Sequence, residues 1–147
     1  MNDLPQILKY PRTPHLAGSA VQDGDQDLSV LPAAVLGHSH IVVEEKVDGS
    51  NCGISFSPNG DLLLQSRGHY LRGGAGEREF QVLKTWANAN RAELWAALGH
   101  QYVMYGEWLF AHHMIYYDQL PSYFIEFDVL HRGTGDFLYT PSRRHRL

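Results

Sequence analysis

Lys46, Asp48 and Gly49 form the pattern Lys-x-Asp-Gly, in which one lysine stands just before an acidic turn. A lysine amine is a nucleophile only when it is neutral, and with a reference pKa of about 10.4 roughly one in a few thousand is neutral at pH 7. A site with a nucleophilic lysine must lower that pKa by burial or nearby cations. The carboxylates of Glu44, Glu45 and Asp48 instead attract a divalent metal. The same pattern is also typical of a solvated hairpin turn.

The segments that position this motif are predicted to be β-strands. The apolar run at 41–43 predicts a short strand that leads to Lys46. Alternation at 54–57, a Pro-Asn-Gly-Asp turn and a second run at 62–67 predict a hairpin. That hairpin ends at Arg67, which we expect near Lys46 if the first strand pairs alongside.

Later segments predict one long helix and two more strands. Apolar residues at helical spacing predict a helix from Glu77 to about Leu98, with Gly99 as its stop. A strand at 102–110 carries Glu107 among apolar neighbours, where a carboxylate needs a partner such as a metal, a ribose or a cation. A further strand at 123–130 carries acidic residues at alternating positions, which predicts that they share one face. Thr140-Pro141 predicts the start of a C-terminal helix.

Composition describes one folded domain. The 147 residues are 44% hydrophobic and 19% charged, which is typical of a globular chain. The formal charge of −4 argues against a polycation that coats nucleic acid without specificity. The N-terminus shows no secretory pattern, and no apolar run approaches the roughly 20 residues that span a bilayer. The single cysteine, Cys52, excludes an internal disulfide, so we expect a cytoplasmic protein.

Two other candidate sites fail on spacing. The glycine-rich segment 68–76 matches neither the P-loop nor the dinucleotide-binding pattern, so it is interpreted as a loop. His112 and His113 are adjacent, and neighbouring residues of a regular element do not face one metal. No zinc site is therefore assigned.

Four motifs in order resemble the RNA ligase family of covalent nucleotidyltransferases, which are relatives of DNA ligases and messenger-RNA capping enzymes. They span about residues 45–130 and are Glu45-Lys46-Val47-Asp48-Gly49-Ser50-Asn51, Ser66-Arg67, Tyr105-Gly106-Glu107 and Phe124-Ile125-Glu126-Phe127-Asp128. The segment from Lys9 to Leu16 also resembles the N-terminal part of bacterial members. The resemblance implies an α+β nucleotidyltransferase (ATP-grasp-like) adenylation domain with antiparallel sheets and a flanking helix.

The resemblance also implies roles for single residues. Lys46 would attack the α-phosphate of ATP and hold AMP, with Mg²⁺ or Mn²⁺ present, and AMP would pass to the 5′-phosphate of RNA or nicked nucleic acid. Asp48 and Gly49 would lie beside the nucleotide. The remaining contacts would be Glu45 and Phe127 to adenine, and Arg67 and Glu107 to the ribose, with Glu107 also suited to metal.

The chain departs from the family pattern after Asp128. The family has two later motifs there, a Glu-Gly strand and a lysine-rich strand that holds the triphosphate, whereas this chain has no lysine after Lys84. Residues 1–147 are therefore predicted to be a single domain that is incomplete at its C-terminus. Alternatives are a DNA ligase, a capping-type enzyme that prefers GTP, or a catalytically inactive nucleotide- or RNA-binding fragment.

Overall fold

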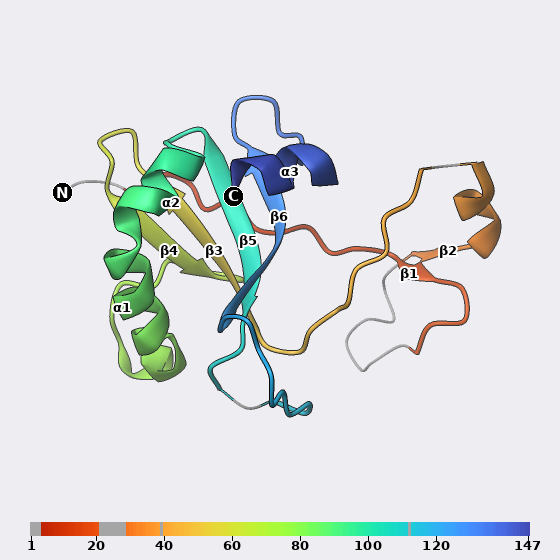
Figure 1. Ribbon diagram of the computed structural model, residues 1–147, viewed down its shortest axis with the longest axis horizontal. Helices are drawn as coiled ribbons and strands as arrows, with labels where there is room; N and C mark the ends of the chain where they lie inside the picture. The colour runs from red at the N-terminus through yellow and green to blue at the C-terminus, as the bar shows by residue number, and fades with distance from the viewer. Residues whose placement is uncertain (1–3, 21–28, 39, 112) are drawn as a thin grey trace. The chain divides into compact units, whose positions relative to one another are not determined.

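The computed structural model describes residues 4–20, 29–38, 40–111 and 113–147. The chain divides into two compact units, one formed by Met1–Lys9 with Lys46–Leu147 and the other by Tyr10–Glu45 (Figure 1). Each unit is described by itself. None of the helices in the described ranges is long and apolar enough to cross a membrane.

The smaller unit has little regular structure. Strand β1 (His15–Leu16) pairs in parallel with β2 (Val30–Leu31), and the 3₁₀ helix η1 spans Ala33–His38. The predicted strand at 41–43 is wrong: this segment is irregular, and the side chain of Val43 is 87% exposed. Three apolar residues suggest a strand, but a strand forms only where a partner supplies ladder hydrogen bonds, and such pairing begins at Ser50.

The larger unit is built on a four-stranded antiparallel sheet with the order β4-β3-β5-β6. Its strands are β3 (Ser50–Phe56), β4 (Leu62–Ser66), β5 (Tyr102–Trp108) and β6 (Phe124–His131). The predicted hairpin is confirmed as β3–β4, and Gly60 takes a positive φ of 83° in its turn. The α+β class with an antiparallel sheet is therefore confirmed.

The predicted long helix is three consecutive segments: η2 (Ala75–Phe80), α1 (Gln81–Ala89) and α2 (Arg91–Leu98). The helix breaks at Asn90, whose φ of −98° and ψ of 15° are not helical. The Asn90 side chain donates to the Trp86 carbonyl, which is the local competition that makes asparagine a poor helix-interior residue. The periodicity nevertheless identified the core, because Leu83, Leu94 and Leu98 are buried against the sheet.

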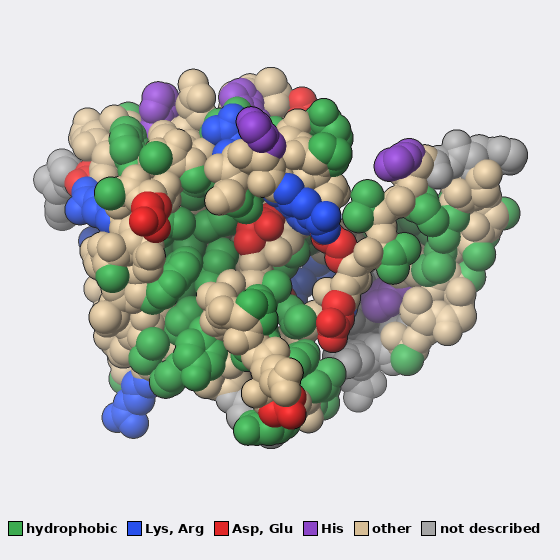
Figure 2. Space-filling view, viewed as in Figure 1, with side chains coloured by type: hydrophobic (Ala, Val, Ile, Leu, Met, Phe, Trp, Pro, Cys, Tyr) green, Lys and Arg blue, Asp and Glu red, His purple; other side chains and the backbone are tan. Residues whose placement is uncertain are grey.

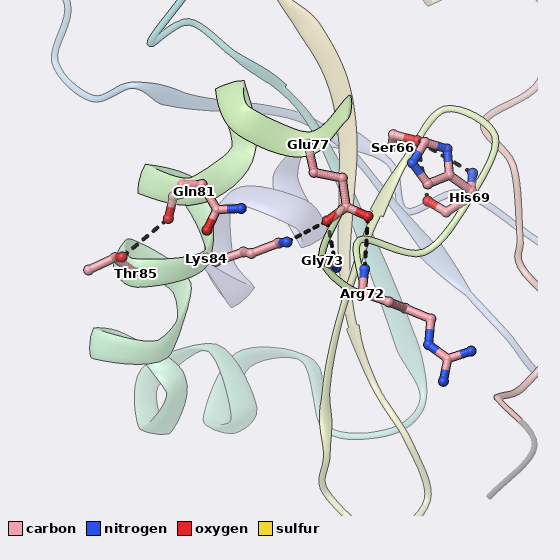
Figure 3. Close-up of polar contacts among 8 residues, drawn as sticks. All are labelled: Ser66, His69, Arg72, Gly73, Glu77, Gln81, Lys84 and Thr85. Carbon is pink, nitrogen blue, oxygen red and sulfur yellow. Dashed lines mark hydrogen bonds and ion pairs between the residues drawn. The ribbon is translucent and has the colours of Figure 1, made fainter. Parts of the chain in front are cut away.

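Glu77 fastens the glycine-rich loop to this helical layer (Figure 3). Its carboxylate accepts hydrogen bonds from the backbone N–H groups of Arg72 (3.1 Å) and Gly73 (2.8 Å) and from the Lys84 ammonium. The hydrogen bond from Lys84 is the main reason that the pKa of Glu77 lies below its ordinary value. Glu77 therefore links the loop, through Arg72 and Gly73, to Lys84 of α1.

Helix α3 (Thr140–Arg146) begins as predicted, although its N-cap is Tyr139 and not Thr140. The buried Arg143 side chain lies 3.3 Å from a carboxylate oxygen of Glu126 and 3.9 Å from one of Asp128. These two acidic residues thus share one cation. On the face in Figure 2, the Lys and Arg side chains lie in small separate groups.

Strand β6 contains a register shift. Asp128 pairs with Tyr105 and Glu126 pairs with Gly106, so Phe127 is the extra residue at this β-bulge. Strict alternation along β6 therefore fails at Phe127. Such a bulge bends the strand locally and redirects the neighbouring side chains.

Candidate functional site

Two of the predicted site residues, Arg67 and Glu107, lie on either side of Asn51 in a row across the sheet. Asn51 of β3 is the direct antiparallel partner of Glu107 on β5, so their side chains share a face. Ser66 of β4 is the ladder partner of Cys52. The next residue, Arg67, therefore lies opposite Asn51, on the side of β3 away from β5. Cys52 and Ile54 point to the opposite face, which packs against the helices. The row Arg67–Asn51–Glu107 therefore lies on the face away from the helical layer.

The N-terminal segment crosses this same face. The Leu8 carbonyl accepts hydrogen bonds from the Gln65 side-chain amide (2.8 Å) and the Tyr105 hydroxyl (2.9 Å). Gln65 and Tyr105 are both partners of Gly53, two residues along β3 from Asn51. The crossing segment is thus fixed next to the row.

Glu107 is the electrostatic centre of the site. Burial raises the pKa of Glu107, the positive charges of Lys46, His113 and Arg67 lower it, and the negative charge of Asp48 raises it. The Glu107 oxygen Oε2 is buried and has no hydrogen-bond partner in the described part of the chain. An unpaired buried acceptor costs about 1–3 kcal/mol, so a ligand hydroxyl or a cation at this oxygen would be stabilised.

Asp48 fastens the lysine motif to the segment that follows β5. Its carboxylate accepts a hydrogen bond from the Met114 backbone N–H (3.0 Å), and its own N–H donates to the Tyr117 hydroxyl (2.7 Å). Residues 46–49 are irregular and lead into β3, so the hairpin alternative for Asp-Gly is wrong. Lys46 is exposed at the start of this lead-in segment.

Gly49 is required by close packing. A Cβ at this position would lie 2.6 Å from the Leu109 side chain and 2.7 Å from the Trp108 carbonyl oxygen. The absence of a side chain at Gly49 thus allows Trp108 and Leu109, at the end of β5, to pack closely against its backbone. Its predicted place beside a nucleotide stays a prediction.

Two predicted adenine contacts lie outside the row. Phe127 is the half-buried bulge residue of β6, the strand beyond β5. Glu45 is exposed and is the last residue of the smaller unit, directly before Lys46 in the chain.

Sequence reasoning missed the partners on the segment after β5. His113 and Tyr117 contact Ser50 and Asp48, and Ser50 also contacts Glu79 of η2. His112 lies outside the described residues. The available signal was length, because a long connection between β5 and β6 is the kind of loop that carries function.

Two surface hollows in the described part of the chain lie away from these residues. Hollows of about 320 Å³ and 340 Å³ are lined by residues such as Lys84 and Arg91, and by Ser142 and Arg146. Neither is lined by Lys46, Arg67 or Glu107. The converging charges therefore identify the site, and cavity size does not.

Comparison with known proteins identifies the family of the chain. No curated protein and no solved structure matched the chain. Residues 39–147 match the family model described as RNA ligase, and this range contains the lysine motif, the row and the whole four-stranded sheet. Membership supports a ligase-type function. The chain belongs to the RNA ligase family.

Proposed function

We propose that this protein is an ATP-dependent RNA ligase-like nucleotidyltransferase that forms a lysyl-AMP intermediate. The observation that carries the proposal is the convergence of Lys46, Asp48 and Arg67 on the half-buried Glu107. A lysine and an arginine whose charges act on one carboxylate suit the handling of a nucleotide and its phosphates. The fold we propose is the nucleotidyltransferase adenylation fold, and the location is the cytoplasm.

In the first step the neutral Nζ of Lys46 attacks the α-phosphorus of ATP. A nitrogen–phosphorus bond forms while the bond from the α-phosphorus to the bridging oxygen breaks, and its electron pair leaves on pyrophosphate. The nitrogen releases a proton to solvent. Catalysis here is mainly positioning and charge stabilisation around an in-line displacement.

The other residues of the site would hold the nucleoside. Arg67 and Glu107 would contact the ribose hydroxyls, and the unpaired Oε2 of Glu107 offers one acceptor for them. Phe127 would stack on adenine, which Glu45 would contact through its polar edge. Asp48 and Gly49 would fix the backbone beside the α-phosphate.

A divalent metal fits the same carboxylate. The described residues contain no group of three or more His, Cys, Asp or Glu arranged to hold a metal. Mg²⁺ is usually bound through one or two carboxylates plus substrate phosphates, and Glu107 with its buried free oxygen meets that need. When bound, Mg²⁺ or Mn²⁺ would spread the negative charge of the phosphates.

In the later steps AMP would pass from Lys46 to the 5′-phosphate of an RNA end or a nick. The 3′-hydroxyl of the other end would then attack that phosphate, form the phosphodiester bond and release AMP. The proposal for these later steps depends on family membership alone. The residues of the described site bear only on the first step, the formation of lysyl-AMP.

The proposal is tested with ATP labelled at the α-phosphate, in magnesium, followed by denaturation. The chain has only three lysines, so Lys46→Ala and the matched control Lys9→Ala locate the adduct. We expect acid-labile label on the wild type and on Lys9→Ala, and none on Lys46→Ala. Equal label on Lys46→Ala would refute the proposed nucleophile.

The same assay separates the alternatives. Preference for GTP would indicate a capping-type enzyme, and sealing of nicked DNA but not RNA would indicate a DNA ligase. ATP binding by a folded wild type without covalent label would indicate a nucleotide-binding module.

A further inference from the structure

A chain of side chains links the helical layer to the segment after β5. The Ser50 hydroxyl lies 3.0 Å from Oε2 of Glu79 and 3.2 Å from Nε2 of His113. A carboxylate accepts hydrogen bonds, so Ser50 donates its single proton to Glu79. The Ser50 oxygen must then accept from His113, and Nε2 of His113 carries a proton.

The far end of this chain is itself held in place. The Glu79 carbonyl accepts a hydrogen bond from the Trp108 indole N–H (2.9 Å), and Trp108 is almost wholly buried beside Glu107 in β5. Ser50 belongs to the lysine motif and is the ladder partner of Trp108. The backbone at Glu79 is therefore fixed relative to β5, the strand that carries Glu107.

The segment after β5 has two more bonds to the same motif. Asp48 binds the Met114 backbone N–H and the Tyr117 hydroxyl. Residues 48–50 and 113–117 are thus joined by three hydrogen bonds, with His113 the member whose charge also acts on Glu107. These three hydrogen bonds restrain the distance between the lysine motif and the segment that follows Glu107 and β5.

We infer that His113 is a positioning residue of the proposed nucleotide site. Through its hydrogen bond to Ser50, it holds the lysine motif and the segment after β5 in the arrangement that places Lys46 beside Glu107. The inference rests on the proposed function for its effect on activity, but the geometric part is independent of it.

The test uses two substitutions of His113, one that keeps a hydrogen-bond donor in the side chain and one that removes it. The amide N–H₂ of His113→Gln can still donate to Ser50, whereas His113→Leu has no donor. Exposed Glu93→Gln on α2 serves as a control for general effects of substitution. For each variant we measure the thermal midpoint, the rate of lysyl-AMP formation at saturating ATP, the KM for ATP, and hydrogen exchange at the Asp48 and Met114 amides.

We expect His113→Leu to slow adenylylation by about tenfold or more at saturating ATP, because small misplacements near reacting groups are costly. The KM and the thermal midpoint should change much less than the rate. Exchange at Met114 should accelerate. His113→Gln should stay within about threefold of the wild type in rate and exchange.

Two results would overturn the inference. Wild-type behaviour of His113→Leu in both rate and exchange would show that the bond positions nothing. Equal damage in His113→Gln and His113→Leu would show that the ring, and not its bond to Ser50, is what matters. If the wild type forms no adduct, the proposed function fails, while the exchange difference between the two variants still decides the positioning claim.

Discussion

Asn51 and Glu107 are direct partners in the β3–β5 ladder, and this pairing places Glu107 beside the end of the lysine motif, while Arg67 lies on the other side of β3. Glu107 keeps one buried oxygen without a hydrogen bond in the described chain, although three cations act on its charge. Proteins rarely leave a buried acceptor unpaired, and exceptions gather at functional sites. This carboxylate is therefore the strongest structural reason to place ligand chemistry on this face.

Glu107→Gln is expected to lose adenylylation by about tenfold or more while gaining stability at neutral pH. Burial raises the pKa of Glu107 in the folded state, so the folded state binds the proton more tightly than the unfolded chain. Wild-type stability should therefore fall relative to the variant as the pH rises above the ordinary carboxyl range. Thermal midpoints from pH 4 to 8 check this, and a variant less stable than wild type at pH 7 would contradict it.

Glu77→Gln should destabilise the fold at neutral pH and remove part of its sensitivity to acid. The pKa of Glu77 is lowered by its hydrogen bond from Lys84, so its stabilisation is present above the ordinary carboxyl pKa and is lost as the pH falls through the lowered value. The thermal midpoint of wild type should drop more steeply than that of the variant between about pH 5 and 2. Exposed Glu93→Gln should follow the wild type, and parallel wild-type and Glu77→Gln curves would argue against this role.

Gly49→Ala is expected to destabilise the larger unit by about 1–3 kcal/mol, because the new methyl group meets the Trp108 carbonyl and the Leu109 side chain. Gly76→Ala is the matched control, since a Cβ there has no atom within 4 Å. Urea unfolding of both variants measures the difference. Equal stability of the two would show that β5 can move away from Gly49.

Cys52 should be unreactive in the folded protein. Its side chain is fully buried in β3, and burial raises the pKa of the thiol further from neutrality, with a smaller contribution from the charge of Glu107. Iodoacetamide should label the native chain very slowly and the urea-unfolded chain rapidly. Fast native labelling would mean that β3 opens readily near the site.

Much of the sheet was predictable from the sequence because alternation and turn residues act locally. The β3–β4 hairpin and the Glu107 strand followed from such patterns. The strand predicted at 41–43 was wrong because three apolar residues do not indicate whether a partner strand is available. The bulge at Phe127 and the break at Asn90 depend on tertiary context and on a single side-chain hydrogen bond, which periodicity does not register.

The site was predictable in part for a similar reason. The strand positions of Arg67 and Glu107 were predictable because each ends or interrupts an apolar run, whereas their roles come only from the family resemblance. His113 and Tyr117 were missed because an irregular loop has no period, and its contacts with Asp48 and Ser50 join residues more than sixty positions apart. Such contacts are set by the folded arrangement alone.

Peptide mass spectrometry after incubation with ATP and magnesium shows whether Lys46 is the covalent nucleophile. We expect an AMP adduct on the peptide containing Lys46, located at that residue by fragmentation, and none on the peptides with Lys9 or Lys84. An adduct on another residue would contradict the account, as would a folded protein that binds ATP and carries no adduct.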